Sequence, residues 1–71
     1  MTIDEILKEI RKTLNISQEQ LARELKISFT TINRWENGRR KPSQLAKMRL
    51  SEYCADNGIS KEIIDALGSI K

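Results

Sequence analysis

The fold of this chain is decided by residues 17–38, which read SQEQLARELKISFTTINRWENG. Two helix starts lie close together in this stretch, because Ser17 and Ser28 are both of a type that caps helix N-termini well. At the first start we expect a capping box, in which the Ser17 hydroxyl accepts from the backbone N–H of Gln20 and the Gln20 side chain reaches back. Only residues 26–27 separate the two helical patterns, so the sequence predicts two short helices that meet at a steep angle.

The second of these helices has an apolar and a polar side. At about 100° per residue, Ile32 and Trp35 fall together on the hydrophobic side, where Trp35 is expected to be part of the core. The opposite side collects four hydrogen-bonding side chains, those of Thr30, Asn33, Arg34 and Asn37. Gly38 then ends the helix, since glycine readily takes the left-handed conformation that follows a helix. A short helix, a tight turn and a second helix with a polar outer side is the arrangement that fits the major groove of B-DNA.

From about Ile10 to Ser43 the chain resembles the lambda Cro and repressor class of helix-turn-helix proteins, also called the xenobiotic-response-element class. The most specific matches are Ser17-Gln18, Leu21-Ala22, Thr31-Ile32, Trp35-Glu36-Asn37-Gly38 and Lys41-Pro42-Ser43. The resemblance implies an all-α fold, a compact lambda-repressor-like domain of four or five helices. We expect a single domain over residues 1–71, a helix-turn-helix at about 17–37 and a recognition helix at about 28–37.

The resemblance also implies roles for single residues. Gln18 would contact one DNA phosphate, and Asn37 with the backbone of Gly38-Arg39 would hold another. Arg11 and Glu36 stand where members of this class pair a basic residue of the first helix with the acid that ends the recognition helix, so this pair would brace that helix. The class usually has glycine in the turn where this chain has Lys26. If Lys26 must take a positive φ, the cost is on the order of 1 kcal/mol.

The polar side of the recognition helix suggests a hypothesis for DNA reading. Arg34 would donate to the O6 and N7 of a guanine, Thr30 or Asn33 would read an adjacent base, and Phe29 would pack on a thymine methyl group. The remaining contacts would go to phosphates and set register without choosing sequence, and the expected residues are Gln18, Asn37, Arg39, Arg40 and Lys41. The alternative is that these are ordinary exposed residues, that Phe29 only covers the turn and that Gln18 only serves its helix start.

The charge distribution agrees with phosphate contact. Residues 34–49 hold six bases and one acid, a net charge of +5, against +3 for the whole chain, so the remainder carries −2. The six bases are Arg34, Arg39, Arg40, Lys41, Lys47 and Arg49. A basic patch beside a helix that fits a groove is the electrostatic footprint of a nucleic-acid-binding protein. A basic run by itself more often forms a solvated surface, and here its position beside the motif favours DNA.

The rest of the chain is expected to support these helices. Thr2 or Asp4 can cap a first helix with apolar residues at helical spacing, namely Ile3, Ile6, Leu7, Ile10 and Leu14. A further helix over residues 44–56 would pack Ala46, Leu50, Tyr53 and Cys54 and end at Asn57-Gly58. Ser60 would cap a last segment with an apolar stripe of Ile63, Ile64, Leu67 and Ile70. Many members of the resembling class dimerise through this region, so we expect a homodimer. The alternative is that the stripe packs inside the monomer.

No catalytic or metal site is expected. The chain has no His and a single Cys54, so neither a zinc cluster nor a disulfide framework can form within it. Its ten carboxylates are dispersed among bases, and no glycine-rich phosphate loop accompanies them. We therefore expect no enzyme activity and no cofactor. No run of about 18 apolar residues and no signal-peptide pattern occurs, which predicts a soluble cytoplasmic protein.

Double-stranded DNA is the expected partner, and two alternatives stay open. The same fold can serve as a protein-binding adaptor or as an antidote that neutralises a toxin, although a polar outer side argues against a pure adaptor. The domain could also control the expression of a restriction or modification enzyme. The sequence alone does not choose between these settings, nor between repressor and activator, with repressor the first expectation.

Overall fold

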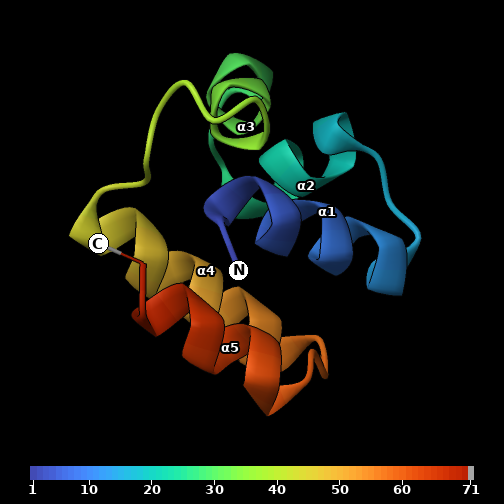
Figure 1. Cartoon of the computed structure of the whole chain (residues 1–71). Coiled ribbons are helices and arrows are strands. Elements are labelled where there is room, and N and C mark those ends of the chain that lie inside the picture. Colours follow the sequence, from blue (N-terminus) through green and yellow to red (C-terminus); the bar gives the residue numbers. More distant parts are fainter. Residues whose placement is uncertain (71) are drawn as a thin grey trace.

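The computed structural model describes residues 1–70 and, within that range, consists of five helices and no strand. The helices are α1 (Ile3–Leu14), α2 (Gln18–Leu25), α3 (Phe29–Glu36), α4 (Gln44–Asp56) and α5 (Lys61–Gly68). Figure 1 shows α1, α2 and α3 grouped together, with α4 and α5 side by side beneath them. The all-α prediction is confirmed, with five helices rather than four, and residue 71 lies outside the described residues.

Serine side chains begin three of these helices, as the sequence predicts for the first two. The Ser17, Ser28 and Ser43 hydroxyl oxygens each accept from a backbone N–H three residues later, at 3.1, 3.1 and 3.2 Å. Ser60 precedes α5 in an extended conformation, but its side chain makes no capping hydrogen bond. Because these signals are local, the predicted helix starts agree with the structure to within a residue.

The capping box predicted at Ser17 forms only in part. The Ser17 half is present, and the prediction for the Gln20 side chain is wrong. The Gln20 side chain does not reach back, because its Nε2 donates instead to Glu24 Oε2 one turn later, at 2.9 Å. A reciprocal box forms at the start of α1, where a Glu5 carboxylate oxygen accepts from the Thr2 backbone N–H at 3.0 Å. Thr2 and not Asp4 is therefore the cap of the first helix.

The turn between α2 and α3 requires a left-handed residue. Lys26 takes φ 59° and ψ 42°, so the position at which the resembling class usually has glycine keeps that conformation here with a side chain. Asn15 after α1 is the other non-glycine residue with positive φ within residues 1–70, and asparagine tolerates this region better than lysine does. Gly38, at φ 72°, follows α3 as predicted.

The core lies where the five helices meet. Its fully buried large side chains are Ile6, Leu7, Ile10, Leu21, Ile32, Leu50 and Leu67, together with Cys54. Trp35 is 6% exposed and belongs to this core, as predicted. Burial in apolar surroundings raises the pKa of the Cys54 thiol to about 11, so this thiol stays protonated near neutral pH.

The apolar stripe of α5 is used inside the monomer. Leu67 is fully buried, while Ile63, Ile64 and Ile70 are partly buried and pack against the core. Lys47 Nζ of α4 donates to the Ile70 carbonyl oxygen at 2.6 Å and holds the end of this segment. The stripe therefore packs at least in part inside the monomer, and the expected homodimer stays a prediction. The exposed large apolar side chains within residues 1–70 are elsewhere, at Met1, Phe29, Leu45 and Met48.

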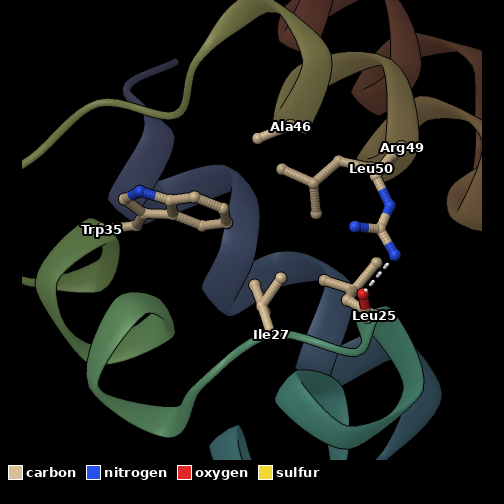
Figure 2. A pocket seen from close by; sticks show the side chains of 6 residues that line it. All are labelled: Leu25, Ile27, Trp35, Ala46, Arg49 and Leu50. Atoms are coloured by element: carbon tan, nitrogen blue, oxygen red, sulfur yellow. Dashed lines mark hydrogen bonds between the residues drawn. The ribbon is translucent and has the colours of Figure 1, made fainter.

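Two side chains of α4 tie it to α2. Arg49 Nη2 donates to the Leu25 carbonyl oxygen at the end of α2, at 2.8 Å, as Figure 2 shows. The Tyr53 hydroxyl donates to Glu24 Oε1 at 2.7 Å, and burial together with this bond raises the tyrosine pKa. A cavity of about 30 Å³ remains in this region, lined by Leu25, Ile27, Trp35, Ala46, Arg49 and Leu50. The packing of α4 thus fixes the α2 end of the turn.

Candidate nucleic-acid interface

The two sides of α3 differ sharply in exposure. Ile32, Trp35 and Glu36 are 0%, 6% and 3% exposed and face the rest of the domain. Thr30 and Arg34 are exposed on the opposite side, as the helical spacing predicts. The Arg34 guanidinium has no ion-pair partner within residues 1–70. Its donors are therefore available to a ligand that meets this side of the helix.

Phe29 stands at the first position of α3 and is 46% exposed. It does not bury itself in the core, unlike Ile32 three residues later. An exposed aromatic ring at the start of a helix that enters a groove can contact the apolar edge of a base. This placement is compatible with the methyl contact expected from the sequence.

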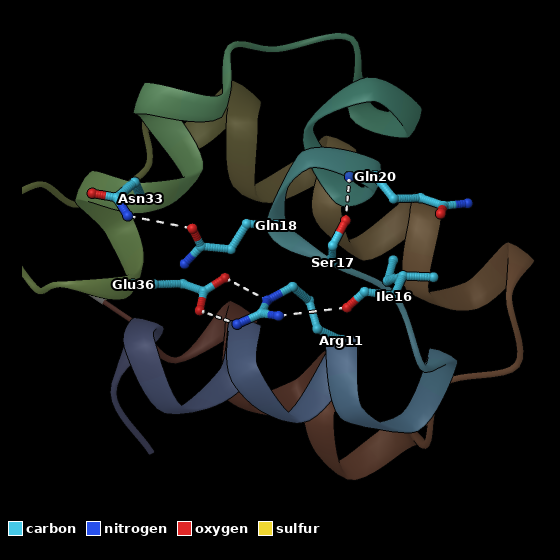
Figure 3. Close-up of polar contacts among 7 residues, drawn as sticks. All are labelled: Arg11, Ile16, Ser17, Gln18, Gln20, Asn33 and Glu36. Atoms are coloured by element: carbon cyan, nitrogen blue, oxygen red, sulfur yellow. Dashed lines mark hydrogen bonds and ion pairs between the residues drawn. The ribbon is translucent and has the colours of Figure 1, made fainter.

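Arg11 and Glu36 are brought together across 25 residues of chain. Arg11 Nε and Nη2 donate to the two Glu36 carboxylate oxygens, both at 2.8 Å, and Nη1 also donates to the Ile16 carbonyl oxygen at 3.4 Å (Figure 3). The Glu36 side chain is 1% exposed, and the hydrogen bonds to it raise the pKa of the guanidinium. This bidentate ion pair joins α1 to the last residue of α3. Its two hydrogen bonds form side by side because the planar guanidinium and the carboxylate match in shape.

A second polar link joins α2 to α3. Asn33 Nδ2 donates to Gln18 Oε1 at 3.3 Å, the contact drawn in Figure 3. Asn33 Oδ1 in turn accepts from Asn37 Nδ2 at 3.0 Å. The three amide side chains form a row of hydrogen bonds that runs from Gln18, the first residue of α2, to Asn37, the residue directly after α3. Asn33 is accordingly half-buried, whereas the sequence alone placed it on the free polar side.

The basic segment after α3 stays exposed. Arg39, Arg40 and Lys41 all lie in the connection to α4 and none of them is buried. Beside α3 a polar groove of about 300 Å³ is lined by Thr31, Arg34, Trp35, Arg40, Lys41 and Ser43. Two other bases of the predicted patch, Lys47 and Arg49, donate to main-chain oxygens inside the domain. The patch beside α3 is therefore smaller than the sequence suggested and lies closer to the helix.

Two groove residues were not predicted as part of the site. Thr31 lies in the groove and its hydroxyl is 2.7 Å from the Ser28 hydroxyl, while Ser43 caps α4 at the far end of the basic segment. The signal for Ser43 was present in the sequence, because it follows Lys41-Pro42 directly and precedes a helical pattern. Nothing in the spacing of Thr31 separated it from other exposed threonines.

Across residues 1–70, no group of three or more His, Cys, Asp or Glu side chains is arranged to hold a metal ion. None of the helices in the described part of the chain is both long enough and apolar enough to span a membrane.

Comparisons with known proteins agree with this geometry. A family model described as helix-turn-helix matches residues 7–55. The HTH-type transcriptional activator BcrR of Enterococcus faecalis is 36% identical over 53 residues, which cover 75% of this chain and 26% of that protein. The chain thus aligns with only about a quarter of the length of this relative. No solved structure matches the chain.

The matched region contains the whole of α2 and α3, most of α1 and nearly all of α4, and so includes the turn, the exposed side of α3 and the basic segment. The Arg11–Glu36 pair and the Gln18–Asn33 link both lie within it. This chain belongs to the Cro/C1-type helix-turn-helix family of DNA-binding transcription regulators.

Proposed function

We propose that the chain binds double-stranded DNA sequence-specifically, with α3 in the major groove, and regulates transcription as a repressor. The observation that carries the proposal is the contrast between the two sides of α3. One side is buried and braced by the Arg11–Glu36 pair, and the other presents Thr30 and Arg34 without obstruction. A groove-reading helix needs a fixed orientation and side chains with unused donors, and this helix combines both.

Base reading is assigned to the exposed side of α3. Arg34 donates two hydrogen bonds to the O6 and N7 of a guanine, and Thr30 or Asn33 contacts a neighbouring base. Phe29, at 46% exposure, packs against a thymine methyl group. Of these, Arg34 contributes most to specificity, because a two-pronged contact to guanine discriminates against other bases by about 1–3 kcal/mol.

Phosphate binding is assigned to residues at both ends of α3. Gln18 at the start of α2 holds one phosphate, and Asn37 with the Gly38-Arg39 backbone holds a second. Arg40 and Lys41 extend this contact along the polar groove. These contacts set the register of the protein on DNA and supply most of the salt-dependent affinity.

The proposal includes a two-fold homodimer on a palindromic site. The C-terminal stripe does not support it, because those side chains pack in the monomer. Support comes instead from α4, where Leu45 and Met48 are 67% and 53% exposed one turn apart. Two large apolar side chains on one helix form a surface that a second copy could cover.

Repression and a cytoplasmic location complete the proposed function. A protein bound across a promoter represses by excluding polymerase, so repression needs no contact beyond DNA binding itself. The relative BcrR carries the name of an activator, and the same DNA contact serves either outcome, depending on where the site lies. A role on DNA favours a cytoplasmic location, which we include in the proposed function.

A protein-binding role, as an adaptor or a toxin antidote, is the second candidate. The same exposed Leu45 and Met48 favour it, because apolar anchors mark protein interfaces. The polar side of α3 has no such anchor apart from Phe29, which is why DNA binding is the first proposal.

Selection of bound duplexes from a random DNA library at near-physiological salt tests the proposal. We expect a palindrome with half-sites about one helical turn apart to be enriched. A single enriched half-site would retain specific reading and overturn the dimer. Weak, salt-sensitive binding with no enriched sequence would overturn the proposal and favour the protein-binding role.

A further inference from the structure

The structure points to a role for Asn33 other than base reading. We infer that Asn33 is a positioning residue, whose amide links Gln18 to Asn37 and turns the Gln18 amide nitrogen toward a DNA phosphate. This inference rests on the proposed function and chooses between the two residues left open there. Thr30, and not Asn33, then contacts the base beside the one that Arg34 reads.

Both polar atoms of the Asn33 side chain already bond to other side chains of the protein. An asparagine amide offers one oxygen that accepts and one nitrogen that donates two hydrogen bonds. The Asn33 oxygen accepts from Asn37 Nδ2 at 3.0 Å, and the nitrogen donates to Gln18 Oε1 at 3.3 Å. Both ends of the amide are therefore engaged at the same time.

Reading a base would compete with both bonds. Asparagine recognises adenine with its oxygen and its nitrogen together, which must then face the same base edge. In this structure the two atoms face two different protein partners, Gln18 on α2 and Asn37 directly after α3. Asn33 is also half-buried, whereas Thr30 and Arg34 are exposed. The free energy needed to break the bonds of Asn33 would be subtracted from the gain of any DNA contact that its amide made.

The link fixes which end of Gln18 is free. Gln18 Oε1 accepts from Asn33, so the two N–H groups of its Nε2 remain as donors. A phosphate group offers only acceptors, and it is therefore matched by the nitrogen end of this amide and not by the oxygen end. Without Asn33, the Gln18 amide could rotate and present its oxygen, which would repel the phosphate oxygens.

The same link connects the two phosphate contacts of the proposed interface. Gln18 is the first residue of α2, and Asn37 directly follows the last residue of α3. With Asn33 between them, these two groups are held at a fixed separation before DNA arrives. Loss of Asn33 is therefore expected to weaken backbone binding while leaving base preference intact.

A double-mutant cycle tests this inference. Asn33→Ala, Gln18→Ala and the double variant are compared with the wild type on the preferred duplex and on a random duplex. We expect Asn33→Ala to weaken binding to both duplexes by the same factor, about threefold to tenfold. In the Gln18→Ala background the same change is expected to cost less than in the wild type, because the Asn37 amide is then the only phosphate-binding group that Asn33 still holds.

Two controls separate positioning from reading and from general damage. Thr30→Ala is the matched variant on the same helix and is expected to change the preference at one base pair in a repeated library selection. Thermal unfolding of each variant reports whether it folds, and Asn33→Ser replaces Asn33→Ala if the latter does not. A loss of affinity caused only by damage to the fold would persist in full in the Gln18→Ala background.

The outcomes distinguish this inference from the proposed function. A changed base preference in Asn33→Ala, or a loss that adds fully to that of Gln18→Ala, would overturn the positioning role while specific binding by the wild type stands. A wild type that selects no sequence would overturn the proposed function itself, whatever the variants do.

Discussion

The two sides of α3 use the same kind of side chain in opposite ways. On the buried side, Arg11 of α1 donates two hydrogen bonds to Glu36, and both partners are committed to the fold. On the exposed side, Arg34 makes no ion pair within residues 1–70. One arginine thus fixes the orientation of the helix, and a second arginine stays free for a ligand.

This division has a physical reason in the size of α3. A helix of eight residues is not stable in water by itself, so its shape comes from packing on one side. Ile32 and Trp35 provide the apolar part of that packing, and the Arg11–Glu36 pair fixes its last turn. We therefore expect substitutions on the buried side to change the free energy of unfolding, and substitutions on the exposed side to change the affinity for DNA.

The largest effect is expected from Arg11→Ala. It leaves the nearly buried Glu36 carboxylate without its partner, so the free energy of unfolding should fall by about 3 kcal/mol. Urea unfolding, followed by the fluorescence of the single Trp35, measures this change. The control is the double change Arg11→Met with Glu36→Leu, which removes both charges and should recover most of the loss. An Arg11→Ala variant as stable as the wild type would show that the pair does not brace α3.

Arg34→Ala is the matching change on the exposed side. Binding to the preferred duplex should weaken by about 1–3 kcal/mol and lose its preference at one base pair, because the contact to guanine is removed. The free energy of unfolding should stay within about 0.5 kcal/mol of the wild type, since the side chain is exposed. Equal losses on preferred and random DNA would contradict the assignment of Arg34 to base reading.

Arg40→Ala should act on all sequences alike. Removing one phosphate contact is expected to weaken both preferred and random duplexes by about 1 kcal/mol and to lower the salt dependence of binding by about one ion. Affinities measured at several salt concentrations give this slope. Lys61→Ala, an exposed base at the start of α5, serves as the control and should change neither quantity. A sequence-dependent effect of Arg40→Ala would move Arg40 into the reading surface.

The smallest effect concerns the turn that sets the angle of α3. Lys26→Gly should raise the free energy of unfolding by about 0.5–1 kcal/mol, because glycine takes the positive φ of this position without strain. Asn15→Gly is the matched control at φ 56° and should gain less, since asparagine already tolerates that region. A loss of stability in Lys26→Gly would mean that the lysine side chain makes a contribution larger than its strain.

Features that depend on local sequence were predictable. Ser17 and Ser28 begin α2 and α3 because a cap acts within three residues of its own position. The exposed and buried sides of α3 follow from helical spacing, which also placed Trp35 in the core. Residues 44–56 were recognised as a helix by the same pattern, and α4 has these bounds.

Features that depend on how helices cross were not predictable. The link from Asn33 to Gln18 exists only because the turn brings α2 and α3 to one particular angle. Gln20 had an alternative partner one turn later in Glu24, and spacing alone does not rank the two. Lys47 and Arg49 donate to the carbonyl oxygens of Ile70, which follows α5, and of Leu25, which ends α2, and a charge count does not contain these contacts.

An NMR titration of the protein with its selected duplex shows whether the exposed side of α3 meets DNA. We expect the backbone amide shifts to change in residues 28–41 and at Gln18, while those of α5 stay unaffected. A random duplex at low salt should affect Gln18 and residues 37–41 more than residues 29–34. Shift changes centred on Leu45 and Met48 of α4, with α3 unaffected, would contradict the account.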